Sequence, residues 1–166
     1  MELYLVRHAI AEDSSSTGRD ADRALTREGE AKMRRIAQGL RAIELRLDLI
    51  LTSPYRRTAE TADILAAVLG GVERRVVAEL AAAGDTGALL AALRPYRQIE
   101  AVALVGHQPD LGHLASHIMT GSPDLCPLPF KKGGVACLEI PSPRGNLRGD
   151  LAWFMTPKQL RALSVD

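Results

Sequence analysis

Apolar runs and helix-like patterns alternate along most of this sequence. Short apolar runs predict strands, which lie at positions 3–6, 49–52, 75–78, 101–105, 135–140 and 151–154. Between them, apolar residues recur at intervals of three and four, the spacing on the buried face of an amphipathic helix. This second pattern predicts a helix that begins near Thr26 and further helices over 58–69, 86–93, 111–118 and 157–163.

The order of these elements predicts an α/β fold. Strands that alternate with helices typically form a largely parallel sheet, which helices cover on both faces. Only a turn-rich stretch at 142–149 separates the last two strands, so we expect them to pair as antiparallel neighbours. The expected architecture is a three-layer α/β/α sandwich around a mixed, mostly parallel central sheet of about six strands. Positions 1–166 contain no repeat or linker, and we expect a single domain.

Composition narrows the range of partners. The chain has 166 residues, with 21 Lys and Arg against 20 Asp and Glu, which gives a net charge of +1. This balance offers no broad positive surface for nucleic acid or an anionic membrane, so any anion site has to be local. No apolar stretch approaches the ~20 residues of a membrane span, and two cysteines are too few for a disulfide framework. We expect a cytoplasmic protein that binds neither nucleic acid nor membrane.

Basic and imidazole side chains follow three of the predicted strands. Arg7 and His8 come directly after the first strand, Arg57 follows the second, and His107 follows the most apolar one. The carboxyl ends of parallel strands meet at one edge of a sheet, so these groups can converge there. An arginine offers a charged fork to an oxyanion, and a histidine can act as a nucleophile. Each residue alone also fits a rim charge or a packed loop, but three strand ends together favour an anion site.

Four blocks of the sequence, in this order, resemble the histidine phosphatase superfamily. They are LVRHA at 5–9, LTREG at 25–29, SPYRRTAETA at 53–62 and VGH at 105–107. The short length and the closing WFMTPKQL at 153–160 are similar to its small branch, the SixA-type phosphohistidine phosphatases. The resemblance extends from residue 2 to about residue 163.

The resemblance implies a role for each of the strand-end residues. His8 would be the nucleophile that becomes phosphorylated, while Arg7, Arg57 and His107 would bind the phosphoryl oxygens. The arginine of the third block stands four residues after its serine in the family, which corresponds to Arg57 and not to Arg56. These cationic groups would neutralise the phosphoryl charge themselves, so we expect no metal ion and no cofactor.

The general acid is less well defined by the sequence. Family members often have an acidic residue after the third strand, and Glu79 is the matching position, with Asp85 as a second candidate. An alkoxide leaving group needs such an acid, whereas the imidazole that leaves from phosphohistidine needs it less. Larger relatives build a helical lid in this region. Only about twenty residues separate Glu79 from the next strand here, so we expect an open pocket.

These observations lead to one predicted function and two alternatives. The prediction is a metal-independent phosphatase that forms a phosphohistidine enzyme intermediate and removes phosphate from phosphohistidine on a signalling or phosphotransfer protein. An open pocket suits a phosphohistidine on a protein surface better than an enclosed metabolite. The alternatives are a general small-molecule phosphomonoesterase of the same superfamily and a phosphoprotein-binding module without turnover.

Two further groups of charged residues lie outside these blocks. Positions 12–23 are rich in Ser, Asp and Gly and predict a loop, whose acidic residues, Asp20 among them, we expect to be solvated. Arg23 in this loop is a candidate contact to the substrate. Lys131 and Lys132, shortly before the fifth strand, either extend the phosphate site or lie in a solvated turn.

Overall fold

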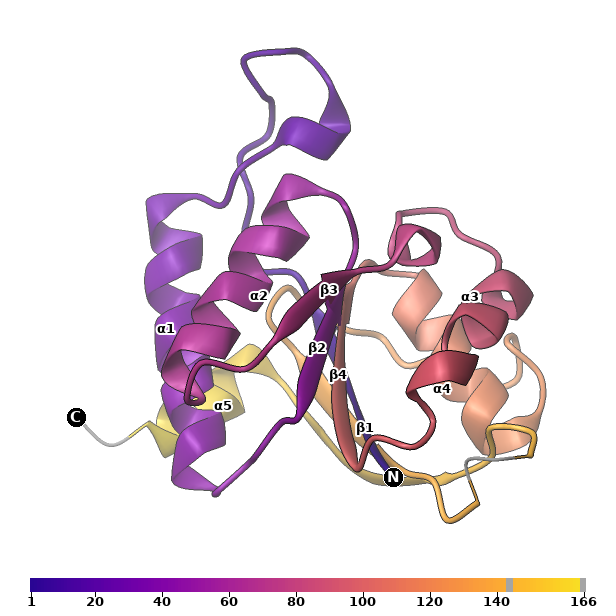
Figure 1. Ribbon diagram of the computed structural model, residues 1–166. Coiled ribbons are helices and arrows are strands. Elements are labelled where there is room, and N and C mark those ends of the chain that lie inside the picture. The colour runs from indigo at the N-terminus through magenta and orange to yellow at the C-terminus, as the bar shows by residue number, and fades with distance from the viewer. Residues whose placement is uncertain (143–144, 165–166) are drawn as a thin grey trace.

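A computed structural model describes residues 1–142 and 145–164, and it has the predicted three layers (Figure 1). Its central sheet contains β1 Glu2–Arg7, β2 Leu49–Thr52, β3 Arg74–Val76, β4 Ala101–Gly106, β5 Val135–Glu139 and β6 Asp150–Met155. The strand order is β3-β2-β4-β1-β5-β6. The first four of these strands are parallel, while β5 and β6 form an antiparallel hairpin that continues the sheet beyond β1. The mixed, mostly parallel sheet predicted from the sequence is confirmed.

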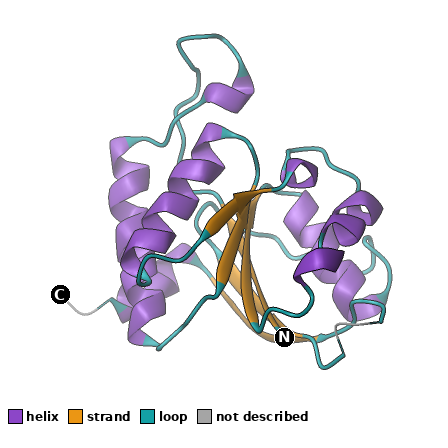
Figure 2. Cartoon of the chain, in the orientation of Figure 1, coloured by secondary structure: helices purple, strands orange, loops and turns teal. Residues whose placement is uncertain are grey.

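Helices cover both faces of this sheet. They are α1 Arg27–Ala42, α2 Arg56–Val68, α3 Thr86–Ala92, α4 Asp110–Thr120 and α5 Pro157–Leu163. Helices α1, α2 and α5 pack on one face, and α3 and α4 pack on the other (Figure 1), with the strands enclosed between the two helical layers (Figure 2). None of the described helices has the length and apolar character needed to span a bilayer.

The alternation of side chains in β1 explains why both faces need cover. Leu3 and Leu5 are buried among residues of the α3 and α4 side, whereas Tyr4 and Val6 are buried against the α1, α2 and α5 side. Successive side chains of a strand point to opposite faces, so an apolar residue at every position requires a helical layer on each side. Each face therefore has its own hydrophobic core.

The register of the central strands brings three chain segments to one edge. Arg7 lies opposite Gly106 at the ends of β1 and β4, and Thr52 lies opposite Val105 at the end of β2. The residues that follow are held to this edge by backbone hydrogen bonds, from His8 N–H to the Gly106 carbonyl and from Ser53 N–H to the Val105 carbonyl, both 3.1 Å long. The segment between β1 and α1 extends beyond this edge (Figure 1) and contains a short 3₁₀ helix, Asp20–Asp22.

Candidate functional site

His8 is the first residue after β1, and its side chain is buried. The Nδ1 atom is 2.7 Å from the carbonyl oxygen of Ala9. A carbonyl oxygen only accepts hydrogen bonds, so Nδ1 carries the ring proton and Nε2 keeps its lone pair. Burial lowers the pKa of His8 to about 4, and the positive charges of Arg57, Arg7 and Lys132 lower it as well. The ring is therefore neutral near pH 7, in the tautomer that a nucleophile at Nε2 requires.

His107 follows β4 and lies beside His8. The centroids of the two rings are 5.3 Å apart. The hydroxyl of Ser53 and Nε2 of His107 form a hydrogen bond of 2.9 Å, and the edge of the Tyr55 ring contacts the imidazole at a centroid distance of 4.9 Å. The pKa of His107 is lowered to about 3, mainly by burial and also by the neighbouring His8 and Arg57. Two imidazoles from adjacent strands thus face one another at the carboxyl edge.

Arg57 lies in the first turn of α2, and only 5% of it is exposed. Its guanidinium carbon is 4.9 Å from the centroid of the Tyr55 ring. Two of its terminal nitrogens donate to Asp20, one to the backbone carbonyl at 2.7 Å and one to the carboxylate at 2.9 Å. Its charge lowers the pKa of both His8 and His107, which places it within electrostatic range of the two rings.

Arg7 ends β1, and its position is fixed by the segment before β5. One terminal nitrogen donates to the Phe130 carbonyl at 2.6 Å, and burial lowers the pKa of the guanidinium. Gly133, which has a φ of +80°, donates its N–H to the carbonyls of both Arg7 and His8. The Nε atom of Arg7 is buried and has no hydrogen-bond partner within the part of the chain that the structure describes. A donor of this kind is available to an anion after a small movement of the side chain.

The structure thus brings together the four residues that the sequence pattern singled out, Arg7, His8, Arg57 and His107. Two fixed guanidinium groups and two neutral imidazoles share one edge of the sheet. Such a set can hold the oxygens of a tetrahedral anion beside a free ring nitrogen.

Comparisons with known proteins show the family of this chain. Residues 3–83 match the family model described as the histidine phosphatase superfamily (branch 1). An uncharacterised protein from Picosynechococcus sp. is 40% identical over 164 residues, which cover 96% of this chain and 99% of that protein. The chain belongs to the histidine phosphatase superfamily.

Within the histidine phosphatase superfamily, the chain is similar to SixA. Phosphohistidine phosphatase SixA from Escherichia coli (strain K12) is 26% identical over 164 residues, covering 97% of each chain. A structure of the protein histidine phosphatase SixA complexed with tungstate has a TM-score of 0.85 at 24% identity and covers 96% of this chain and 99% of that one. A structure from Agrobacterium tumefaciens assigned as a phosphohistidine phosphatase SixA has a TM-score of 0.79 at 27% identity, covering 94% and 97%. These matches support phosphatase activity and the predicted α/β fold.

The two candidate general acids of this superfamily member have different surroundings. Glu79 lies in a short 3₁₀ helix, Ala78–Leu80, that follows β3. Its side chain is exposed, and it forms no hydrogen bond or ion pair with the described residues. Asp85 is the N-cap of α3, and its carboxylate accepts the Ala88 N–H at 2.7 Å. Asp85 therefore has a structural partner, and the role of Glu79 stays a prediction.

Asp20 is exposed, as expected for an acidic residue of this loop, but it also contacts a residue of the candidate site. Its carboxylate accepts from Arg57 on one oxygen and from Arg23 on the other, the latter at 2.7 Å. The hydrogen bonds from these two arginines lower the pKa of Asp20. Arg23 also donates to the Glu12 carbonyl, so it braces the loop around Asp20. The sequence carried no signal for this contact, because Asp20 and Arg57 are 37 positions apart.

Thr61 is a second residue that sequence reasoning did not assign to the site. Its fully buried hydroxyl accepts the Ala9 N–H at 3.1 Å and donates to the Arg57 carbonyl at 2.6 Å. It therefore links the segment after β1, which contains the nucleophile candidate, to the first turn of α2, which contains Arg57. Threonine in the TAET stretch also fits an ordinary helix, so the sequence pattern did not distinguish Thr61 from its neighbours.

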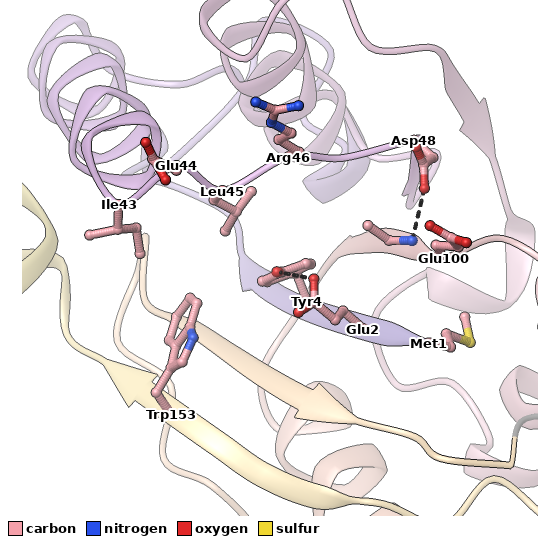
Figure 3. Close-up of a pocket in the computed structure, with 11 residues that line it drawn as sticks. Met1, Glu2, Tyr4, Ile43, Glu44, Leu45, Arg46, Asp48, Glu100 and Trp153 are labelled. Atoms are coloured by element: carbon pink, nitrogen blue, oxygen red, sulfur yellow. Dashed lines mark hydrogen bonds between the residues drawn. The ribbon is translucent and has the colours of Figure 1, made fainter.

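A cavity of about 750 Å³ lies at the opposite end of the molecule, beside the amino end of β1 (Figure 3). Its lining includes the carboxylate side chains of Glu2, Glu44, Asp48 and Glu100 and contains none of the four strand-end residues. Two of these carboxylates already accept hydrogen bonds, Glu2 from the Tyr4 hydroxyl and Asp48 from the Ala101 N–H. Four carboxylates against the one guanidinium of Arg46 give this lining a negative charge, which disfavours a phosphoryl group.

Proposed function

We propose that this protein is a phosphatase that removes the phosphoryl group from phosphohistidine on another protein, through a phosphohistidine intermediate at His8. One observation carries the proposal. The hydrogen bond from His8 Nδ1 to the Ala9 carbonyl leaves a lone pair on Nε2, in a ring whose pKa burial lowers to about 4. A neutral imidazole with a free nitrogen, flanked by two guanidinium groups, is a nucleophile poised for an electrophilic phosphorus.

In the first step, Nε2 of His8 attacks phosphorus in line with the bond to the leaving nitrogen. The bond from phosphorus to the substrate imidazole breaks, and its electron pair stays on that ring. The substrate ring leaves as neutral imidazole when its other nitrogen carries a proton. The enzyme ring becomes a phosphorylated imidazolium, whose Nδ1 proton still bonds to the Ala9 carbonyl. The backbone contact thus stabilises the positive charge that forms on the ring.

In the second step, water attacks the phosphorus atom of phosphorylated His8 from the opposite side. The bond from phosphorus to Nε2 breaks, the electron pair returns to the ring, and phosphate leaves as H2PO4−, with the oxygen and both protons of the water. In both steps the negative charge of the transferring group is spread over its three equatorial oxygens. In this proposal Arg7, Arg57 and His107 bind these oxygens, and the two guanidinium groups supply charge stabilisation of the kind a metal ion provides in other phosphoryl-transfer enzymes.

The surroundings of Glu79 support phosphohistidine over a phosphate ester as the substrate. An alkoxide leaves well only when an acid protonates it, and that acid must be held within hydrogen-bond reach. Glu79 is exposed and unpaired among the described residues. Departure of an imidazole needs no such fixed donor. SixA proteins, which this chain resembles, are named as phosphohistidine phosphatases, and one of their structures holds tungstate, a tetrahedral oxyanion like phosphate.

The proposal is tested by trapping phosphate on the enzyme. Brief reaction with a phosphohistidine-labelled protein, followed by an alkaline quench, is expected to leave acid-labile phosphate on His8. His8→Ala should abolish this label, and Arg57→Ala should reduce its rate of formation by at least about a hundredfold, as loss of a transition-state charge partner does. His113→Ala, a histidine substitution on α4 outside the site, is the matched control and should label normally.

Three results would overturn the proposal. Label that persists in His8→Ala would exclude His8 as the nucleophile. Turnover of sugar phosphates with a kcat/KM equal to or above that of the phosphohistidine protein would identify a small-molecule phosphomonoesterase instead. Tight phosphoprotein binding with no turnover and no label would identify a binding module.

A further inference from the structure

A second, smaller pocket of about 370 Å³ adjoins the candidate site. We call it the flanking pocket; its floor is apolar and its rim is cationic. The floor includes Ile10, from the segment after β1, and Met33 and Ile36 from α1. The pocket lies at the lower end of the range of ligand sites, about 300–1,000 Å³, which suits one or two side chains of a bound segment.

All of the charged residues that line the flanking pocket are positive. They are Arg7, Lys32, Lys131, Lys132 and Arg161. No carboxylate lines the pocket. Among the described residues, only Lys32 of these five has an ion-pair partner, Glu28 one turn earlier in α1, and Arg161 lowers the pKa of the same carboxylate.

This concentration of positive charge stands out in a chain with a net charge of +1. Five cations against one adjacent carboxylate, that of Glu28, leave an excess of positive charge around the apolar floor. Such a surface attracts a partner that carries both carboxylates and an apolar side chain.

The flanking pocket is continuous with the candidate site. Arg7 belongs to both, and Ala9, whose carbonyl accepts from His8, also lines the pocket. The charge of Lys132 contributes to the lowered pKa of His8, so its ammonium group lies within electrostatic range of that ring. A polypeptide whose phosphohistidine meets His8 therefore has neighbouring residues within reach of the pocket.

We infer that the flanking pocket binds an acidic segment of the substrate protein, next to its phosphohistidine, with one apolar side chain on the floor and carboxylates on the rim. This inference rests on the proposed function and specifies its substrate. A second phosphate group would also bind lysines, but it would leave the apolar floor in water. The combination of floor and rim favours a peptide.

The test compares two charge-reversed variants that differ only in location. Lys32→Glu/Arg161→Glu changes α1 and α5 inside the flanking pocket. Arg34→Glu/Lys158→Glu changes the same two helices outside it, with the same change in net charge. Lys32 and Arg34 each pair with a glutamate one turn earlier, so both variants lose one such pair. Equal melting temperatures for the two variants will show that they are comparably folded.

Each variant is assayed on three substrates. They are phosphoramidate, a phosphohistidine peptide with Asp, Glu and Leu flanks, and the same peptide with Asn and Gln in place of the acids. In the wild-type and control proteins, we expect the acidic peptide to have at least about tenfold higher kcat/KM than the neutral one. Lys32→Glu/Arg161→Glu should remove this preference and change phosphoramidate turnover by less than about twofold, because a small substrate does not reach the pocket.

A binding measurement separates this inference from the proposed function. Anisotropy of the labelled, unphosphorylated acidic peptide is measured with His8→Ala, alone and combined with each charge-reversed pair. Selective loss of binding in the pocket variant supports the flanking pocket even if no phosphohistidine turnover occurs. Equal kcat/KM for acidic and neutral peptides, or equal losses in the two variants, overturns the inference while leaving the proposed function intact.

Discussion

At the scale of single residues, one backbone contact and burial determine the chemistry of His8. The Ala9 carbonyl holds the ring proton on Nδ1 through its backbone, independently of the side chain at position 9. Burial and nearby positive charges then keep Nε2 unprotonated. The sequence pattern predicted that His8 lies at the carboxyl end of a strand. It could not predict the lowered pKa, which arises mainly from burial in the fold and also from charges that include Arg57 and Lys132, far along the chain.

The lowered pKa predicts how the first chemical step depends on pH. We expect phosphorylation of His8 by phosphoramidate to proceed at nearly constant rate from about pH 8 to about pH 5, since a ring with a pKa of about 4 stays mostly neutral in this range. A histidine with the ordinary pKa of about 6.5 would lose roughly thirtyfold by pH 5. Rapid-quench measurement of the phosphoenzyme distinguishes the two. A midpoint near 6.5 would contradict the assignment of His8.

At the scale of elements, the sequence predicted best the helix starts that are marked by a capping residue. Thr26 caps α1, and Thr156 with Gln159 forms a capping box at the start of α5, as threonine followed by a helical pattern indicates. Helix α2 begins at Arg56, two residues before the predicted start. The prediction missed this start because the N-cap residue, Tyr55, forms no side-chain cap and is not a typical capping residue. The short edge strand β3 begins one residue and ends two residues before the predicted strand at 75–78. Its residues are all exposed, so no alternation of apolar and polar residues marks its ends.

The sequence did not predict that the loop between β1 and α1 contacts the candidate site. It places the Asp20 carboxylate on the same Arg57 guanidinium that is proposed to bind the phosphoryl oxygens. The site residues at strand ends were predictable because the sheet register aligns them. Asp20 and Thr61 were not, because they reach the site through contacts across 37 and 52 positions.

We expect Asp20→Asn to tighten the binding of phosphate and tungstate. The substitution keeps an oxygen that accepts from Arg57 and removes a negative charge that competes with the anion. The side chain of Asp20 is 56% exposed, so solvent screening limits the gain to a few-fold. Calorimetric titration of the wild-type protein, Asp20→Asn and the loop control Asp13→Asn measures it. Weaker binding in Asp20→Asn would indicate instead that the carboxylate positions Arg57.

At the scale of the whole molecule, the two buried histidines, His8 and His107, make the free energy of unfolding depend on pH. Both rings are neutral in the native state, with pKa values lowered to about 4 and about 3, while in the unfolded chain a histidine has a pKa of about 6.5. As pH falls below 6.5, the unfolded state binds protons that the native state does not. The free energy of unfolding therefore decreases, and the stability present above this pH is lost progressively toward pH 4.

We expect the free energy of unfolding to be lower at pH 5.5 than at pH 7.5, by about 1 kcal/mol for each of the two histidines. Urea denaturation at both values, in buffers without phosphate, measures the difference. In His8→Asn/His107→Asn most of it should disappear, because neither state can then take up these protons. His113→Asn/His117→Asn, a matched pair on α4, should behave as the wild type does. If the first double variant lost as much stability on acidification as the wild type, the site histidines would not be held neutral. Added phosphate should stabilise the wild-type protein at both pH values, since an anion that binds only the native state raises the free energy of unfolding.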